Sequence, residues 1–140
     1  MNKIVNCLDT NRDTALLFVR IGIGLMFIFV HGGPKILGGP EGWDKIGGMI
    51  GVLGITFYPT ALGFIASLFE LLGGIFIALG LFTRLGAAMI LSTLIVAAAT
   101  MYVAKGLFAA SPAIEDSLFM ILLIFLGGGK YSIEHKLCKK

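Results

Sequence analysis

Charged residues are scarce in this sequence. Asp, Glu, Lys and Arg together make up 14% of its 140 residues, against about 25% in an average soluble domain. Hydrophobic residues make up 57%. This composition excludes a soluble domain with a large core and predicts one membrane-embedded domain. The net charge of +3 is small, and the basic residues are scattered or gathered near the C-terminus, so no nucleic-acid-binding patch is expected.

Cysteine and histidine are almost absent. Cys7 and Cys138 lie at opposite ends without CxxC spacing, so nothing supports a disulfide framework, a thiol-redox motif or a zinc site. Of the two histidines, His135 belongs to the C-terminal tail, which excludes a haem held by two histidines. No cysteine cluster is available for an iron–sulfur centre, and no dinucleotide-binding fingerprint is present. We therefore expect no metal, haem or iron–sulfur cofactor.

Long apolar segments, by contrast, are plentiful. A bilayer core is crossed by roughly 17–25 helical residues, and four segments approach this length, at about 14–31, 60–82, 85–103 and 113–128. They predict an all-α integral membrane four-helix bundle. Pro59 and Pro112 are interpreted as helix starts, where a missing N–H costs nothing. The short connector at Thr83 and Arg84 predicts a tight hairpin between the second and third spans.

The first connection is long and rich in glycine. Within it Trp43, Ile46, Ile50 and Leu53 recur at helical spacing, which favours a short interfacial helix anchored by Trp43 over an irregular loop.

The distribution of basic residues predicts the orientation. Connections rich in Lys and Arg usually stay in the cytoplasm. The side of the termini carries the larger set of basic residues, namely Lys3, Arg12, Arg84, Lys130, Lys136, Lys139 and Lys140. The opposite side carries Lys35, Lys45 and Lys105. Both termini are therefore expected in the cytoplasm, and the first connection outside it.

Glu70 is the most informative charged residue. It lies near the middle of the second span, on one stripe with Gly63, Ser67 and Gly74. Small residues let helices approach closely in lipid, so Glu70 is expected to face the bundle interior. An acid at this depth is either a functional proton acceptor or a hydrogen-bonded lock between helices.

Arg20 and His31 share one face of the first span, because helix geometry returns position 31 to within about 40° of position 20. Arg20 either pairs with Glu70 or extends to the lipid headgroups. His31 is either an interfacial residue or, with Lys35, the polar mouth of an apolar pocket that has Glu70 beneath it.

Two further acids precede the fourth span. Glu115 and Asp116 are expected in its first helical turn, where acids favour the helix dipole. Glu115 is in addition a candidate site residue.

These residues together resemble the DoxX family of small four-helix bacterial membrane proteins. The similarity lies in the order and spacing of Arg20, "HGGPK" from His31, "ELLGG" from Glu70, Glu115 and "GGGKYSIEH" from Gly127. It implies a multi-pass protein of the bacterial cytoplasmic membrane. The family includes the membrane subunit of a thiosulfate:quinone oxidoreductase, and other members resemble membrane anchors of thiol- and oxidant-handling enzymes.

The favoured function is a quinone-interacting membrane subunit of a bacterial oxidoreductase, related to sulfur compounds or oxidants. Candidate catalytic residues are Glu70 and His31, and candidate quinone-binding residues are Arg20, His31, Lys35, Glu70 and Glu115. A protein partner is expected to supply the electrons, and exposed Gly22 is compatible with a homodimer. The alternatives are a non-catalytic membrane anchor or assembly protein and a small transporter, which four short spans without a repeat disfavour.

Overall fold

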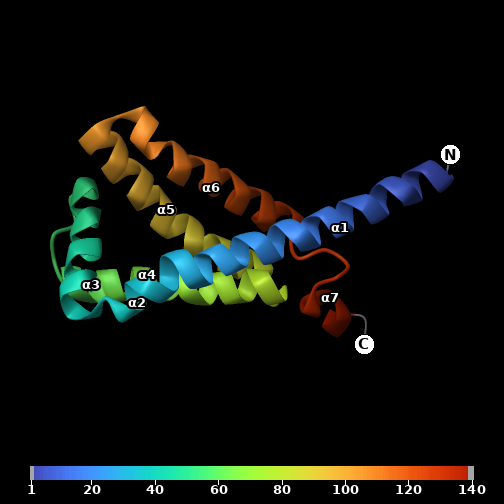
Figure 1. Ribbon diagram of the computed structural model, residues 1–140, viewed down its shortest axis with the longest axis horizontal. Helices are drawn as coiled ribbons and strands as arrows, with labels where there is room; N and C mark the ends of the chain where they lie inside the picture. The colour runs from blue at the N-terminus through green and yellow to red at the C-terminus, as the bar shows by residue number, and fades with distance from the viewer. Residues whose placement is uncertain (1, 139–140) are drawn as a thin grey trace.

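The protein is a bundle of long helices, as the computed structural model in Figure 1 shows. The structure describes residues 2–138, and the side chains of residues 12–137. The helices in chain order are α1 (Asn2–Met26), the π-helical turn η1 (Phe27–Gly32), α2 (Gly33–Leu37), α3 (Gly39–Gly48), the 3₁₀ helix η2 (Met49–Leu53), α4 (Pro59–Leu79), α5 (Thr83–Lys105), α6 (Leu107–Leu126) and α7 (Ile133–Cys138).

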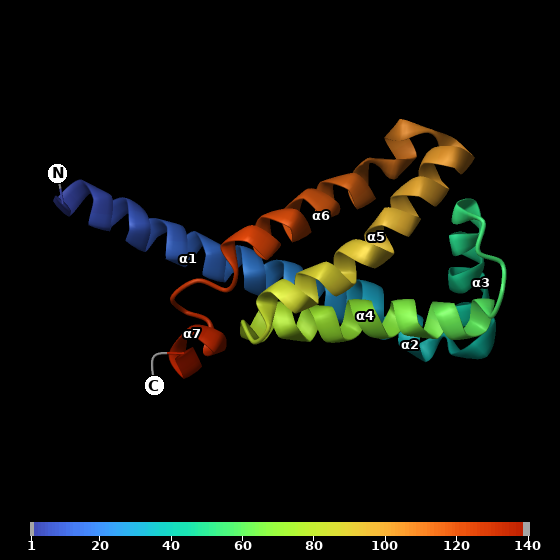
Figure 2. The ribbon, with the colours of Figure 1, turned by 180° about the vertical axis from the view of Figure 1, so that it is seen from behind.

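Four segments are long and apolar enough to cross a membrane, and the prediction of an all-α membrane bundle is confirmed. The first runs without a break from Arg12 through η1 to Leu37, and the others are α4, α5 and α6. Only residues 80–82 join α4 to α5, with Gly80 and Phe82 both in the left-handed conformation. The first residues of α1 and the short α7 lie at the same end of the bundle (Figure 2).

α4 packs against α1, α3 and α5, and small residues make these contacts possible. A Cβ on Gly74 would lie 2.9 Å from the carbonyl oxygen of Gly24 in α1, and a Cβ on Gly73 would lie 2.7 Å from that of Gly86 in α5. Backbones can approach this closely only where side chains are missing. The predicted stripe is confirmed, because Gly63, Ser67, Glu70 and Gly74 are all buried.

Apolar side chains cover the outside of the bundle as well as its core. The core gathers Phe27, Ile77, Ile90, Met120 and Leu123, whereas Phe29 is 71% exposed on the outside of the bundle. An apolar surface of this kind is stable in lipid and would aggregate in water. The structure therefore agrees with a protein whose solvent is the bilayer.

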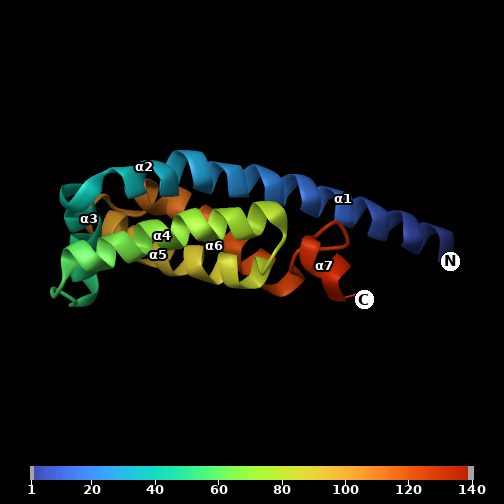
Figure 3. The ribbon, with the colours of Figure 1, turned by 90° about the horizontal axis from the view of Figure 1, so that it is seen from below.

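The first connection is helical, as predicted, and the alternative of an irregular loop is wrong. α3 lies against the start of α4 (Figure 3). A Cβ on Gly47 would collide with the carbonyl oxygen of Pro59, and a Cβ on Gly63 with that of Trp43, so the two helices meet backbone to backbone. The position of α3 in the membrane interface stays a prediction.

The start of α6 differs from the prediction. α6 begins at Leu107, and Pro112 lies inside it. The proline ring removes the N–H that would bond to the carbonyl oxygen of Phe108, and the hydroxyl of Ser111 donates to that oxygen instead, at 3.1 Å. The expected place of Glu115 and Asp116 in the first turn is therefore wrong, and the helix dipole does not explain them.

Candidate functional site

The candidate site begins at the π-helical turn in the first span. In η1 the N–H of Gly33 bonds to the carbonyl oxygen of Ile28, five residues back. Gly32 lies against the backbone of α4, where a Cβ would collide with the N atom of Leu71 and lie 2.9 Å from the carbonyl carbon of Glu70. The glycines thus bring the first span directly onto α4 beside Glu70. Wide turns of this type occur frequently at functional sites.

One helical turn later, Lys35 pairs with Glu70. The Nζ of Lys35 donates to both Oε1 and Oε2 of Glu70, each at 2.7 Å. The Glu70 side chain is 6% exposed and that of Lys35 is 34% exposed. A buried carboxylate needs a partner of opposite charge, and Lys35 supplies it from α2.

Trp43 fixes the backbone that carries Lys35. Its indole Nε1–H donates to the carbonyl oxygen of Lys35 at 3.0 Å, and its ring meets Phe64 of α4 edge to face, with centroids 4.8 Å apart. The close packing of α3 on α4 therefore holds α2 in place. The lysine is positioned from both sides, by the carboxylate it binds and by the helix that follows it.

The ion pair lies at the wall of a largely apolar cavity. This cavity has a volume of about 220 Å³ and lies between α4, α5 and the α2–α3 segment. Apart from the ion pair, its polar side chains are Ser92 and Thr93, whose hydroxyls donate to the carbonyl oxygens of Met89 and Ile90. The remaining walls are aliphatic or aromatic side chains and one glycine, namely Ile46, Gly47, Met49, Ile50, Leu62, Ile65, Ala66, Phe69, Val96 and Ala97.

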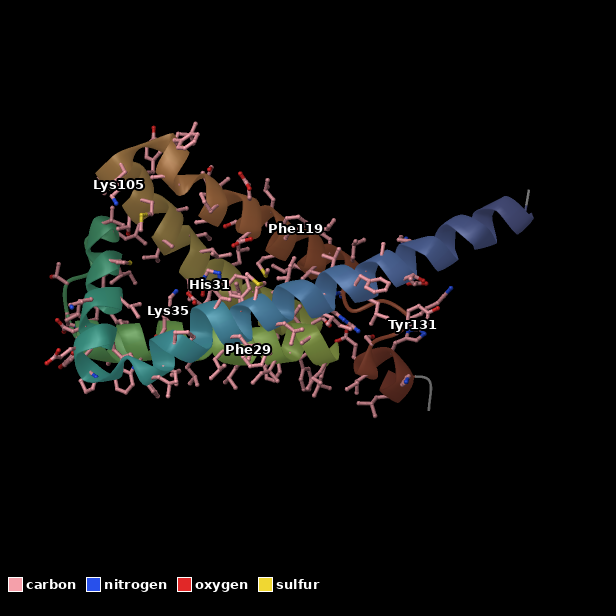
Figure 4. The ribbon with its side chains drawn as sticks, in the orientation of Figure 1. Phe29, His31, Lys35, Lys105, Phe119 and Tyr131 are labelled. Atoms are coloured by element: carbon pink, nitrogen blue, oxygen red, sulfur yellow. The ribbon has the colours of Figure 1, made fainter. Side chains whose placement is uncertain are left out.

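His31 lines a different cavity. Its ring stacks at a tilt on Phe27, with centroids 5.0 Å apart, and it faces a space of about 360 Å³ that it shares with Asp116 and Phe119 of α6. None of the described residues lines both cavities. The structure therefore brings Lys35 and Glu70 together and places His31 with Asp116 instead. Figure 4 labels His31 and Lys35 on the first span and Phe119 on α6.

Arg20 contacts neither Glu70 nor the membrane surface. Its side chain is 1% exposed. Nη1 donates to the carbonyl oxygen of Gly128 at 2.8 Å, and Nη2 to that of Tyr131 at 3.2 Å. Arg20 thus holds the segment that follows α6, and both alternatives drawn from the sequence are replaced by this third arrangement.

The candidate residue Glu115 is exposed on α6, away from both cavities, whereas its neighbour Asp116 lines the second one.

Sequence reasoning also missed several polar contacts. Glu134 accepts the N–H groups of Thr83 and Gly128, and its signal was the closing "GGGKYSIEH" segment. Nothing in the sequence pointed to the contact between Trp43 and Lys35. Within residues 12–137, no group of three or more potential metal ligands is found.

Comparison with known proteins gives one family match and one relative. Residues 15–103 match the DoxX family, a range that includes Arg20, Lys35 and Glu70. An uncharacterized protein of Haemophilus influenzae is 32% identical over 143 residues, covering 97% of this chain and 100% of that protein. No solved structure matches significantly. The chain is a multi-pass membrane protein, and it belongs to the DoxX family.

Proposed function

We propose that this protein is the quinone-binding membrane subunit of a bacterial oxidoreductase, located in the cytoplasmic membrane with both termini in the cytoplasm. The observation that carries the proposal is the Lys35–Glu70 ion pair at the wall of an apolar cavity within the bundle. Ligand sites commonly combine apolar walls with a few placed polar groups. The cavity is smaller than the roughly 300–1,000 Å³ of drug-sized pockets, so it suits a single ring with its tail left in lipid.

The donor set suits a quinone carbonyl. A lysine ammonium has three N–H donors, and two of those on Lys35 point at Glu70. The third has no acceptor among the described residues, so it is free to donate to a ligand oxygen. Lys35 therefore binds and orients the ring, and the apolar side chains of α4 and α5 exclude water from it.

A bound quinone supplies two-electron, two-proton chemistry, and a partner protein must supply the electrons. A proton that Lys35 Nζ gives to the ring oxygen would leave a neutral amine, which regains its proton from water because the Lys35 side chain is 34% exposed. The Glu70 carboxylate, within hydrogen-bond distance, favours the recharged ammonium. Glu70 also holds the ammonium at the cavity wall. In this proposal Lys35 and Glu70 act together, and His31, which lines the other cavity, does not contact the ring.

Trp43 provides the test, because it is the single tryptophan and contacts Lys35. Quenching of its fluorescence by decylubiquinone in nanodiscs measures binding. Lys35→Met/Glu70→Gln removes both charges at similar volume, and binding should weaken by about 10- to 150-fold, the value of a hydrogen bond to a charged group. Lys105→Met is the matched control, and it and His31→Ala should both stay within about twofold of wild type.

The same ion pair also supports a second function, a membrane anchor or assembly protein for a partner enzyme. The two-pronged contact gives each Glu70 oxygen a donor and joins α2 to α4. In that case the double variant would bind quinone as wild type does, and only its unfolding midpoint in detergent would fall. This result would reject the quinone proposal.

A further inference from the structure

A second polar site lies at the end of the bundle that holds the termini. A groove of about 940 Å³ opens there between the start of α1, the α4–α5 turn, the end of α6 and α7. Figure 3 shows α7 beyond the α4–α5 turn, on the side of the N-terminal half of α1. No step of the proposed function uses this groove, and it is far from the Lys35–Glu70 cavity along the bundle.

The acids in the groove are already occupied. Glu134 accepts the N–H of Thr83 at 3.1 Å through Oε2 and that of Gly128 at 2.9 Å through Oε1. Arg20, buried beneath, interacts electrostatically with the same carboxylate. Asp13 accepts the N–H of Lys130 at 3.3 Å and pairs with its Nζ at 3.3 Å. Both oxygens of Glu134 therefore already accept a backbone N–H, and Asp13 has Lys130 as its cation.

Two arginines of the groove have no ion pair with a described residue. Arg12 and Arg84 both line the groove and are exposed, and neither guanidinium has a hydrogen bond or an ion pair to any residue that the structure describes. His135 also lines the groove. Its Nε2 atom is buried and has no hydrogen-bond partner among the described residues. The groove thus offers unpaired donors and a surplus of positive charge.

One wall of the groove is apolar. Phe82, Leu85 and Leu126 line it and are 58%, 53% and 40% exposed. Arg84 and Leu126 stand at the ends of membrane-spanning helices, which is where headgroups meet acyl chains. An amphiphile can therefore place its charged head on the arginines and its chains against this wall.

We infer that the groove binds the phosphate group of an anionic phospholipid, with Arg12 and Arg84 as its ligands. Guanidinium groups match phosphate oxygens with two parallel N–H donors. Basic pockets between spans on the cytoplasmic side are a known type of lipid headgroup site. The lipid would join α1, the α4–α5 turn and α6 at the end that Arg20 already holds.

Native mass spectrometry of the full chain, with added phosphatidylglycerol, tests this inference. Each arginine near an anionic headgroup contributes about fivefold in affinity. Arg12→Gln and Arg84→Gln should each weaken retention by about fivefold, and the double variant by about thirtyfold. Lys105→Gln, at the opposite end of α5 (Figure 4), is the matched control and should retain lipid as wild type does.

Three results would overturn the inference. If the double variant retains phosphatidylglycerol as wild type does, the arginines are not its ligands. Equal retention of phosphatidylcholine would show that charge does not select the lipid. If inorganic phosphate displaces the lipid with comparable affinity, the site belongs to a soluble anion.

Two controls separate lipid binding from folding and from the quinone site. Both arginines are exposed, so the unfolding midpoints of the variants without lipid should equal that of wild type. Quinone titration of Trp43 should be unaffected as well.

Discussion

Arg20 shows how a buried charge in a membrane span can serve the fold. Two backbone carbonyl oxygens, of Gly128 and Tyr131, accept its hydrogen bonds. A Cβ on Gly80 would collide with its Nη1 atom, so the α4–α5 turn also depends on a glycine there. The planar guanidinium reaches both carbonyls at once, which a lysine ammonium on a flexible stem does not do equally well.

This contact predicts different costs for two substitutions. Arg20→Lys should lower the free energy of unfolding by about 1–3 kcal/mol, because buried acceptors lose donors. Arg20→Met should lower it by about 2–6 kcal/mol, because the carbonyl oxygens of Gly128 and Tyr131 both lose their donor. Unfolding in mixed detergent measures both values. If Arg20→Lys matched wild type, the side chain would instead behave as one that extends to the headgroups.

At the scale of the element, the π-helical turn decides which charged residues meet. A π-helical turn has more residues than an α-helical turn, so each residue in it rotates by less than the usual angle of about 100°. A helix face drawn with the α-helical angle is therefore no longer correct beyond Met26. His31, inside the turn, therefore faces α6, while Lys35, beyond it, reaches Glu70 on α4. Gly32 sets the position of the turn against α4.

Gly32→Ala tests this role against a matched control. Its Cβ would push η1 away from Leu71, which should cost about 1–3 kcal/mol of stability and move Lys35 from Glu70. Gly22→Ala lies in the same span, where a Cβ meets nothing within 4 Å, and should leave stability unchanged or slightly raised. Unfolding midpoints and quinone titration of Trp43 measure both effects. Equal behaviour of the two variants would contradict the role given to Gly32.

These elements also show what the sequence could predict. Hydropathy and the small-residue stripe predicted the four spans and the burial of Glu70, because both depend on local pattern. The partner of Arg20 could not be predicted, since the segment after α6 returns from more than a hundred residues away. The start of α6 was predicted wrongly because Ser111 compensates for Pro112. The separation of His31 from Lys35 depends on a turn whose hydrogen bonds leave no pattern in the sequence.

Over the whole molecule, polar groups gather at two levels. The Lys35–Glu70 cavity lies beside α3, and the arginine groove lies at the end that holds both termini. Between them lie close helix contacts, apolar packing and the cavity that His31 and Asp116 share. The proposed quinone ring would enter the first site from lipid, and the proposed phospholipid would secure the end of the bundle that holds both termini.

The proposed quinone site beside Lys35 and Glu70 is tested most directly by locating the bound ring. An azidoquinone irradiated with the protein in nanodiscs, followed by peptide mass spectrometry, marks the residues nearest to it. A quinone bound in the Lys35–Glu70 cavity should label residues 62–70 of α4 and 92–97 of α5, which line it. These labels should be lost when unlabelled decylubiquinone competes. Competed labels on residues 19–31 and 116–119, around His31 and Asp116, or labels that no competitor removes, would contradict the proposed site.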